Sequence, residues 1–82
     1  MRRRKTYSVE PTGRSGFIYR EGDQSVSVFS EFLSGDKYDM VAYLSRVDRW
    51  DSPEDAGPLT DEDRERIKKN VTAALRVNIE WA

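Results

Sequence analysis

The 82-residue sequence contains neither cysteine nor histidine. Without cysteine a chain has no disulfide framework and no thiolate nucleophile. The absence of histidine removes the commonest general base and a usual zinc ligand, which argues against an enzyme and against a bound metal or cofactor. No apolar run approaches the roughly 20 residues of a membrane span, and the arginine-rich start lacks the apolar stretch of a secretory signal. The lack of cysteine fits a reducing cytosol, so a cytoplasmic location is expected.

Charge is nearly balanced overall but unevenly distributed. The net charge of −1 gives no general attraction to nucleic acid or to acidic membranes. The first residues, however, are basic (Arg2, Arg3, Arg4 and Lys5), and residues 51–63 carry acids without a base (Asp51, Glu54, Asp55, Asp61, Glu62 and Asp63). Because a chain this short rarely divides, we expect a flexible basic arm at 1–5 and one small domain at 6–82.

Alternating apolar residues predict four strands, at residues 6–10, 16–20, 25–33 and 37–45. In the third strand, Val26 and Val28 point to one face and Phe29 and Leu33 to the other, which indicates a central strand or a bulge near Phe29. The fourth has the cleanest alternation and is predicted to be a long principal strand, extending towards Trp50.

One helix is predicted at residues 61–76. Thr60 can cap its first turn, where the helix dipole favours the negative charges of three acids. Four apolar residues of the helix form one stripe: Ile67, Val71, Ala74 and Leu75. Asn78 is the expected C-cap, followed by a short strand containing Ile79 and Trp81. The predicted fold class is therefore α+β: an antiparallel meander of order β-β-β-β-α-β, with the C-terminal helix packed on one face of the sheet.

A single helix covers one face of a sheet, yet this sheet has apolar side chains on both faces. Phe29, Leu33, Val41 and Tyr43 are the residues expected away from the helix. An apolar patch on an uncovered face would mark an interface with a protein partner or with a second copy in a homodimer.

The segment from Arg46 to Pro58 supports two interpretations. Arginine and tryptophan are frequent in interface hot spots, so Arg46, Arg49 and Trp50 are candidate partner-binding residues, with Arg49 able to stack on Trp50. In the favoured alternative, Trp50 closes the edge of the core beneath the loop and Pro53 packs on it. The acids of the loop could in principle bind a cation, but a solvated acidic loop is the favoured interpretation.

The chain resembles the immunity protein 74 family of bacterial polymorphic toxin systems, mainly over residues 49–82. The likeness lies in Arg49-Trp50-Asp51-Ser52-Pro53, in the stretch from Leu59 to Ile67, and in Asn70-Val71. It implies a cytoplasmic, non-enzymatic protein that binds and neutralises a toxin domain. The candidate partner-binding residues are Arg46, Arg49, Trp50, Phe29, Val41 and Tyr43.

An alternative function is that of a small nucleic-acid-binding module. In that case the basic arm (Arg2, Arg3, Arg4 and Lys5) would neutralise phosphates. The near-neutral charge makes nucleic acid the less favoured partner. An enzyme that uses only carboxylates is the weakest hypothesis, because so short a chain encloses little space.

Overall fold

The computed structural model describes residues 6–13 and 15–82 and contains five strands and one α-helix. The strands are β1 (Tyr7–Pro11), β2 (Gly16–Glu21), β3 (Gln24–Phe32), β4 (Met40–Ala42) and β5 (Ile79–Trp81). The helix, α1 (Asp61–Leu75), lies between β4 and β5 in the chain. Two single 3₁₀ turns, Leu44–Arg46 and Glu54–Ala56, occupy the connection from β4 to α1.

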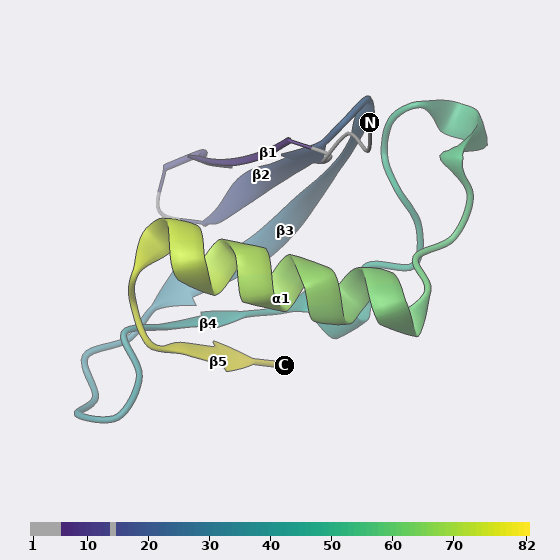
Figure 1. The fold of residues 1–82 in the computed structure, drawn as a ribbon. Coiled ribbons are helices and arrows are strands. Elements are labelled where there is room, and N and C mark those ends of the chain that lie inside the picture. The colour runs from purple at the N-terminus through teal and green to yellow at the C-terminus, as the bar shows by residue number, and fades with distance from the viewer. Residues whose placement is uncertain (1–5, 14) are drawn as a thin grey trace.

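The five strands form one sheet in chain order, and α1 lies across one of its faces (Figure 1). The first four strands are antiparallel neighbours, whereas β5 runs parallel to β4. The predicted α+β fold, with its order of elements and its C-terminal helix, is thus confirmed. The sheet is mixed rather than wholly antiparallel, because α1 returns the chain to the starting end of β4 before β5 begins.

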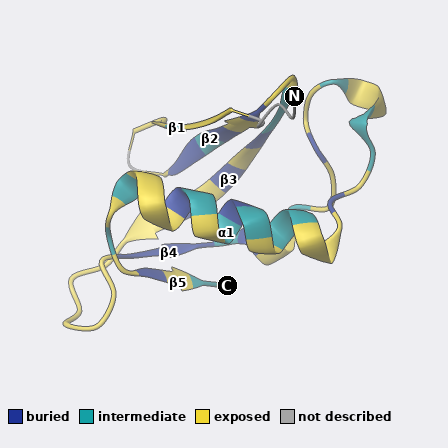
Figure 2. Ribbon diagram, viewed as in Figure 1, coloured by how far each residue is buried: buried dark blue, intermediate teal, exposed yellow. Residues whose placement is uncertain are grey.

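The core lies between the sheet and the buried side of α1 (Figure 2). Strict alternation along β2 and β3 places every second side chain in it, and their register is continuous from Gly16 opposite Phe29 to Glu21 opposite Gln24. There is accordingly no bulge at Phe29, and β3 is the central strand. The main core residues are Phe17, Tyr19, Val26, Val28, Met40, Ala42, Leu44, Trp50, Leu59, Ile67, Val71 and Ile79.

The long fourth strand is the main error of the sequence prediction. Only Met40–Ala42 is a strand, because the chain closes a loop before it and a turn after it. The N–H of Leu33 donates to the carbonyl of Asp39 at 2.9 Å, and the N–H of Val47 donates to that of Leu44 at 3.0 Å. Val41 still faces away from the helix as predicted, opposite the exposed Glu31, while Met40, Ala42 and Leu44 are buried in the core.

The start of α1 is as predicted, but its end is not. Thr60 and Asp63 form a capping box, in which each side chain accepts a hydrogen bond of 3.0 Å from the other's N–H. The helix ends at the left-handed Arg76 (φ 55°) rather than at Asn78. The carbonyl of Asn78 instead accepts hydrogen bonds from the N–H groups of Asp39 and Met40, and Asn78 leads into β5.

The apolar stripe of α1 is narrower than predicted. Ile67 and Val71 are fully buried, Leu75 is partly buried, and Ala74 is exposed. The buried positions therefore follow a spacing of four, which is one row along the helix.

Candidate partner-binding surface

The sheet face opposite α1 carries an aromatic and cationic patch. Phe29 of β3 is 58% exposed there. The N–H of Tyr43 donates to the carbonyl of Phe29 at 2.9 Å, which continues the β3–β4 register by one residue and makes the two side chains neighbours on this face. The guanidinium of Arg46 lies 4.5 Å from the centre of the Tyr43 ring, a cation–π distance. Together with Val41, these residues are called the Phe29–Arg46 patch below.

Val41 is the buried member of this patch. It is only 8% exposed, although it faces away from α1. Its cross-strand neighbours on the same face are Glu31 of β3 and Glu80 of β5, both exposed. Long side chains on either side of a valine shield it while their charges stay in water. The patch thus combines aromatic rings and one cation with a flank of carboxylates.

Four predicted binding residues come together in the patch, and two do not. Arg49 and Trp50 belong to the loop at 48–59, which folds back on itself. The N–H of Leu59 donates to the carbonyl of Asp48 at 3.0 Å, and the N–H of Trp50 to that of Gly57 at 3.2 Å. The guanidinium of Arg49 donates to the carbonyl of Glu54 at 2.7 Å. Among the described residues, the cation–π contact joins Arg46 to Tyr43, not Arg49 to Trp50.

Trp50 is part of the core. Its side chain is 2% exposed, and its ring lies 6.3 Å from that of Tyr19 at an angle of 32°. This burial supports the interpretation of Trp50 as the residue that closes the core beneath the loop. It offers almost no surface to a partner.

The same loop pairs with the part of the β3 edge that the short strand β4 does not reach. Ser25 and Ser52 form a bridge, in which the N–H of Ser25 donates to the carbonyl of Ser52 at 2.8 Å. The carboxylate of Asp51 accepts from the N–H of Ser27 at 2.7 Å. The side chain of Asp51 therefore accepts a hydrogen bond from the backbone of β3. The loop takes the place of a neighbouring strand at this edge.

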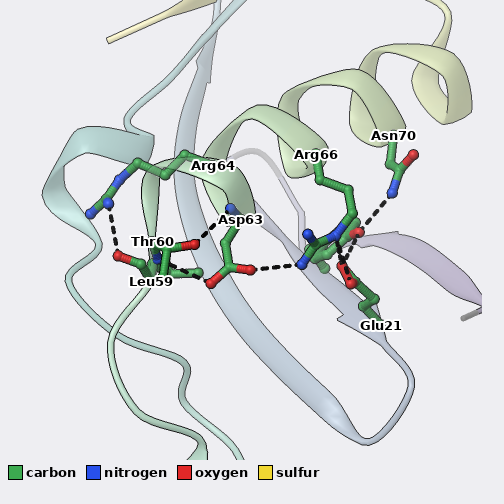
Figure 3. A network of polar contacts seen from close by, with 8 residues as sticks. Glu21, Leu59, Thr60, Asp63, Arg64, Arg66 and Asn70 are labelled. Atoms are coloured by element: carbon green, nitrogen blue, oxygen red, sulfur yellow. Dashed lines mark hydrogen bonds and ion pairs between the residues drawn. The ribbon is translucent and has the colours of Figure 1, made fainter.

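A buried polar network attaches α1 to β2, and it was not predicted from the sequence (Figure 3). The Glu21 carboxylate is 2% exposed and accepts from Nε of Arg66 at 2.8 and 3.0 Å and from the hydroxyl of Tyr19 at 2.8 Å. Arg66 also pairs with Asp63 at 2.7 Å, and the Asn70 amide donates to the Tyr19 hydroxyl at 2.9 Å. In the part of the chain that the structure describes, no buried side-chain nitrogen or oxygen lacks a partner.

The network shifts the pKa values of its members. Burial raises the pKa of Tyr19 to about 12; the Asn70 hydrogen bond opposes this and the Glu21 carboxylate adds to it. The hydrogen bond to Glu21 raises the pKa of Arg66. Burial alone would raise the pKa of Asp63, but hydrogen bonds from Thr60 and Arg66 outweigh it and lower that pKa. The lowered pKa of Asp63 and the raised pKa of Arg66 both favour the charged forms, as expected for two groups that pair with each other at 2.7 Å.

The basic arm of the nucleic-acid hypothesis (Arg2, Arg3, Arg4 and Lys5) lies outside the described residues. Within residues 6–13 and 15–82, no three His, Cys, Asp or Glu side chains are placed to hold a metal ion. In the same residues, no helix has both the length and the apolar character needed to cross a membrane.

Comparison with known protein families places this α+β domain in one of them. The model of the family described as immunity protein 74 matches residues 11–78, most of the chain. The chain therefore belongs to the immunity protein 74 family. The match extends well before residue 49 and includes β2, β3, β4, α1 and the Phe29–Arg46 patch. Neither the curated proteins nor the solved structures gave a match.

Proposed function

We propose that the protein neutralises a toxin domain by binding it through the Phe29–Arg46 patch, in the bacterial cytoplasm and without a catalytic step of its own. Membership of the immunity protein 74 family supports a toxin as the partner. The single observation that carries the choice of surface is the 58% exposure of Phe29 in the middle of the uncovered sheet face.

The chemistry of the patch suits a protein interface. Aromatic residues and arginine supply most hot spots, because an aromatic ring buries a large area and a guanidinium forms several directed hydrogen bonds. In the patch, the Tyr43 ring holds the Arg46 guanidinium at 4.5 Å, which limits the conformational freedom that binding must remove. The backbone of Phe29 is paired on both sides, with Gly16 of β2 and with Tyr43. The patch is thus already ordered before a partner arrives.

The charges around the patch indicate what the partner must carry. Glu31 and Glu80 lie on the same face as Phe29, on either side of Val41, and Arg46 lies beyond Tyr43. A complementary toxin surface places an apolar group on Phe29, a carboxylate near Arg46 and basic groups near the two glutamates. Neutralisation then follows from covering part of the toxin that its substrate must reach.

The binding test uses the cognate toxin domain and compares two phenylalanines of the same strand. We expect Phe29→Ala to weaken binding by about 30-fold or more, which corresponds to a hot spot of about 2 kcal/mol. Phe32→Ala is the matched control. Phe32 is 69% exposed but lines an apolar cavity of about 110 Å³ on the helix side. Titration calorimetry and protection of growth on co-expression measure the effect. Loss of binding in Phe32→Ala, with Phe29→Ala unchanged, would contradict the choice of face.

Stoichiometry tests the absence of catalysis. A protein that acts by occlusion protects only when it is present in at least equal amounts, whereas an enzyme protects at a small fraction of the toxin concentration. We expect toxin activity in vitro to fall linearly as the protein is added and to reach zero at about one equivalent of protein per toxin. Complete protection far below one equivalent would instead show that the protein modifies the toxin.

A further inference from the structure

The outer strand β1 presents an unpaired backbone edge. The other two long strands are paired on both sides. β2 lies between β1 and β3, and β3 pairs with β2, with β4 and, beyond the end of β4, with the 51–52 segment. Among the described residues, β1 pairs on one side only, and Figure 1 shows its other side at the margin of the molecule. Such an edge is a template for another strand unless side chains or bulges block it.

The hydrogen-bonding register shows which residues face outward. The N–H of Gly22 donates to the carbonyl of Thr6, and the N–H of Thr12 donates to that of Gly16. In an antiparallel pair these bonded positions recur at every second residue, so Ser8 and Glu10 also pair with β2. Tyr7 and Val9 therefore direct their N–H and C=O groups away from the sheet. Pro11 ends this open stretch because it has no N–H.

We propose that a second copy of the chain pairs with this edge, antiparallel, about a two-fold axis through Ser8. Tyr7 then lies opposite Val9 of the second copy, and the reverse, so that about four hydrogen bonds form between the chains. This register pairs both outward-facing residues that carry an N–H and a C=O, Tyr7 and Val9, and leaves out Pro11, which has no N–H. Tyr7, 40% exposed, and Val9, partly buried, both point to the helix side, where the paired copies bring their apolar side chains together. Two five-stranded sheets become one continuous sheet.

The opposite edge of the sheet is unsuited to the same arrangement. Asn78 and Ala82 hydrogen-bond with β4 and its flanking residues, so Ile79 and Trp81 direct their backbone groups outward. A two-fold axis through this three-residue strand passes through Glu80 and places two carboxylates directly opposite each other, which is destabilising. At β1 the residue on the axis is the uncharged, exposed Ser8. The charge on the axis thus selects β1.

This dimer is independent of the proposed toxin binding. The Phe29–Arg46 patch lies on β3, β4 and the turn that follows β4, away from the β1 edge, so a dimer presents two such patches. The interface consists of one short strand from each copy, which is small for a permanent complex. A reversible, concentration-dependent equilibrium between monomer and dimer is therefore expected.

Charges placed on the axis test the geometry. Sedimentation equilibrium of the full chain should show dimers whose fraction rises with concentration. Ser8→Lys and Ser8→Asp each place like charges face to face, and each should be monomeric where the original protein is dimeric. Mixing the two variants should restore the dimer, because opposite charges then meet. Ser27→Lys is the control: Ser27 is exposed on the same face but lies on the central strand, so its dimer should persist.

Four results would overturn the proposal. The first is a monomer over the whole soluble concentration range, and the second is a dimer that survives both Ser8 variants. The third is failure of the mixed variants to recover the dimer while circular dichroism shows both folded. The fourth is a series of species larger than a dimer, which would indicate head-to-tail pairing of β1 with β5.

Discussion

Replacing Arg66 by methionine isolates the energetic role of the buried network. Arg66→Met keeps the length and apolar stem of the side chain but leaves the Glu21 carboxylate, 2% exposed, with only the Tyr19 hydroxyl as donor. Breaking a fully buried ion pair costs about 3–5 kcal/mol. Because the Arg66 side chain is 39% exposed, water can reach the vacated position, and we expect about 2–3 kcal/mol.

That loss is large for a domain of this size. A chain of 82 residues has a free energy of unfolding of about 4–12 kcal/mol. Each kcal/mol lowers the melting temperature of such a domain by about 4–8 °C, so Arg66→Met should lower it by roughly 10–20 °C. Urea unfolding followed by tryptophan fluorescence measures the free energy directly, because Trp50 is buried in the core.

Lys68→Met is the matched control for this experiment. Lys68 lies on the same helix and pairs with Glu65 at 3.3 Å, but in an exposed position. Such a pair contributes less than about 0.5 kcal/mol. If Arg66→Met costs no more than Lys68→Met, Glu21 does not depend on Arg66. A double-mutant cycle with Glu21→Gln should give a coupling energy above about 1 kcal/mol, and additive losses would refute the network as drawn.

Three further predictions concern other parts of the fold. Gly16→Ala should cost more than about 1 kcal/mol in urea unfolding, because its new Cβ would lie 2.5 Å from the Val28 carbonyl; Gly35→Ala, with no atom within 4 Å, should be nearly neutral. Thr60→Ala removes the helix cap and should cost about 1 kcal/mol in the same assay. The pKa of Tyr19 is about 12 in the folded protein and 10.0 ordinarily. The protonated Tyr19 therefore stabilises the folded state fully below pH 10, and this contribution is lost between pH 10 and 12. Unfolding measured against pH should show this loss, and Tyr19→Phe should lack it.

Local patterns predicted the parts of the fold that depend on local physics. Alternation along β3 correctly assigned Val28 to the core and Phe29 to the other face, because side chains on a strand alternate whatever lies around them. The cap at Thr60 was predicted for a similar reason, since it depends on residues within one helical turn. Phe29, Val41 and Tyr43 could therefore be expected together on the uncovered face.

The remainder depended on contacts between distant segments. The length of β4 is set by the turn that begins at Tyr43, and alternation continues through that turn without a signal. For Trp50 the sequence left two interpretations, an interface residue and the favoured core residue, and only the folded loop around it decides for the core. Glu21 is 45 positions from Arg66, and only its place after Phe17 and Tyr19 on the core side of β2 could have suggested a buried acid needing a partner.

The parallel pairing of β5 with β4 sets an order for folding. The hairpins β1–β2 and β2–β3 join residues close in the chain and can form as soon as they are synthesised. β5 must instead meet β4 across residues 43–78, which costs more loop-closure entropy than either hairpin unless α1 is already docked. Until then, the apolar side of the first strands faces water and is open to aggregation. The rate at which α1 docks, rather than the formation of strands, should govern how much newly made protein reaches the native state.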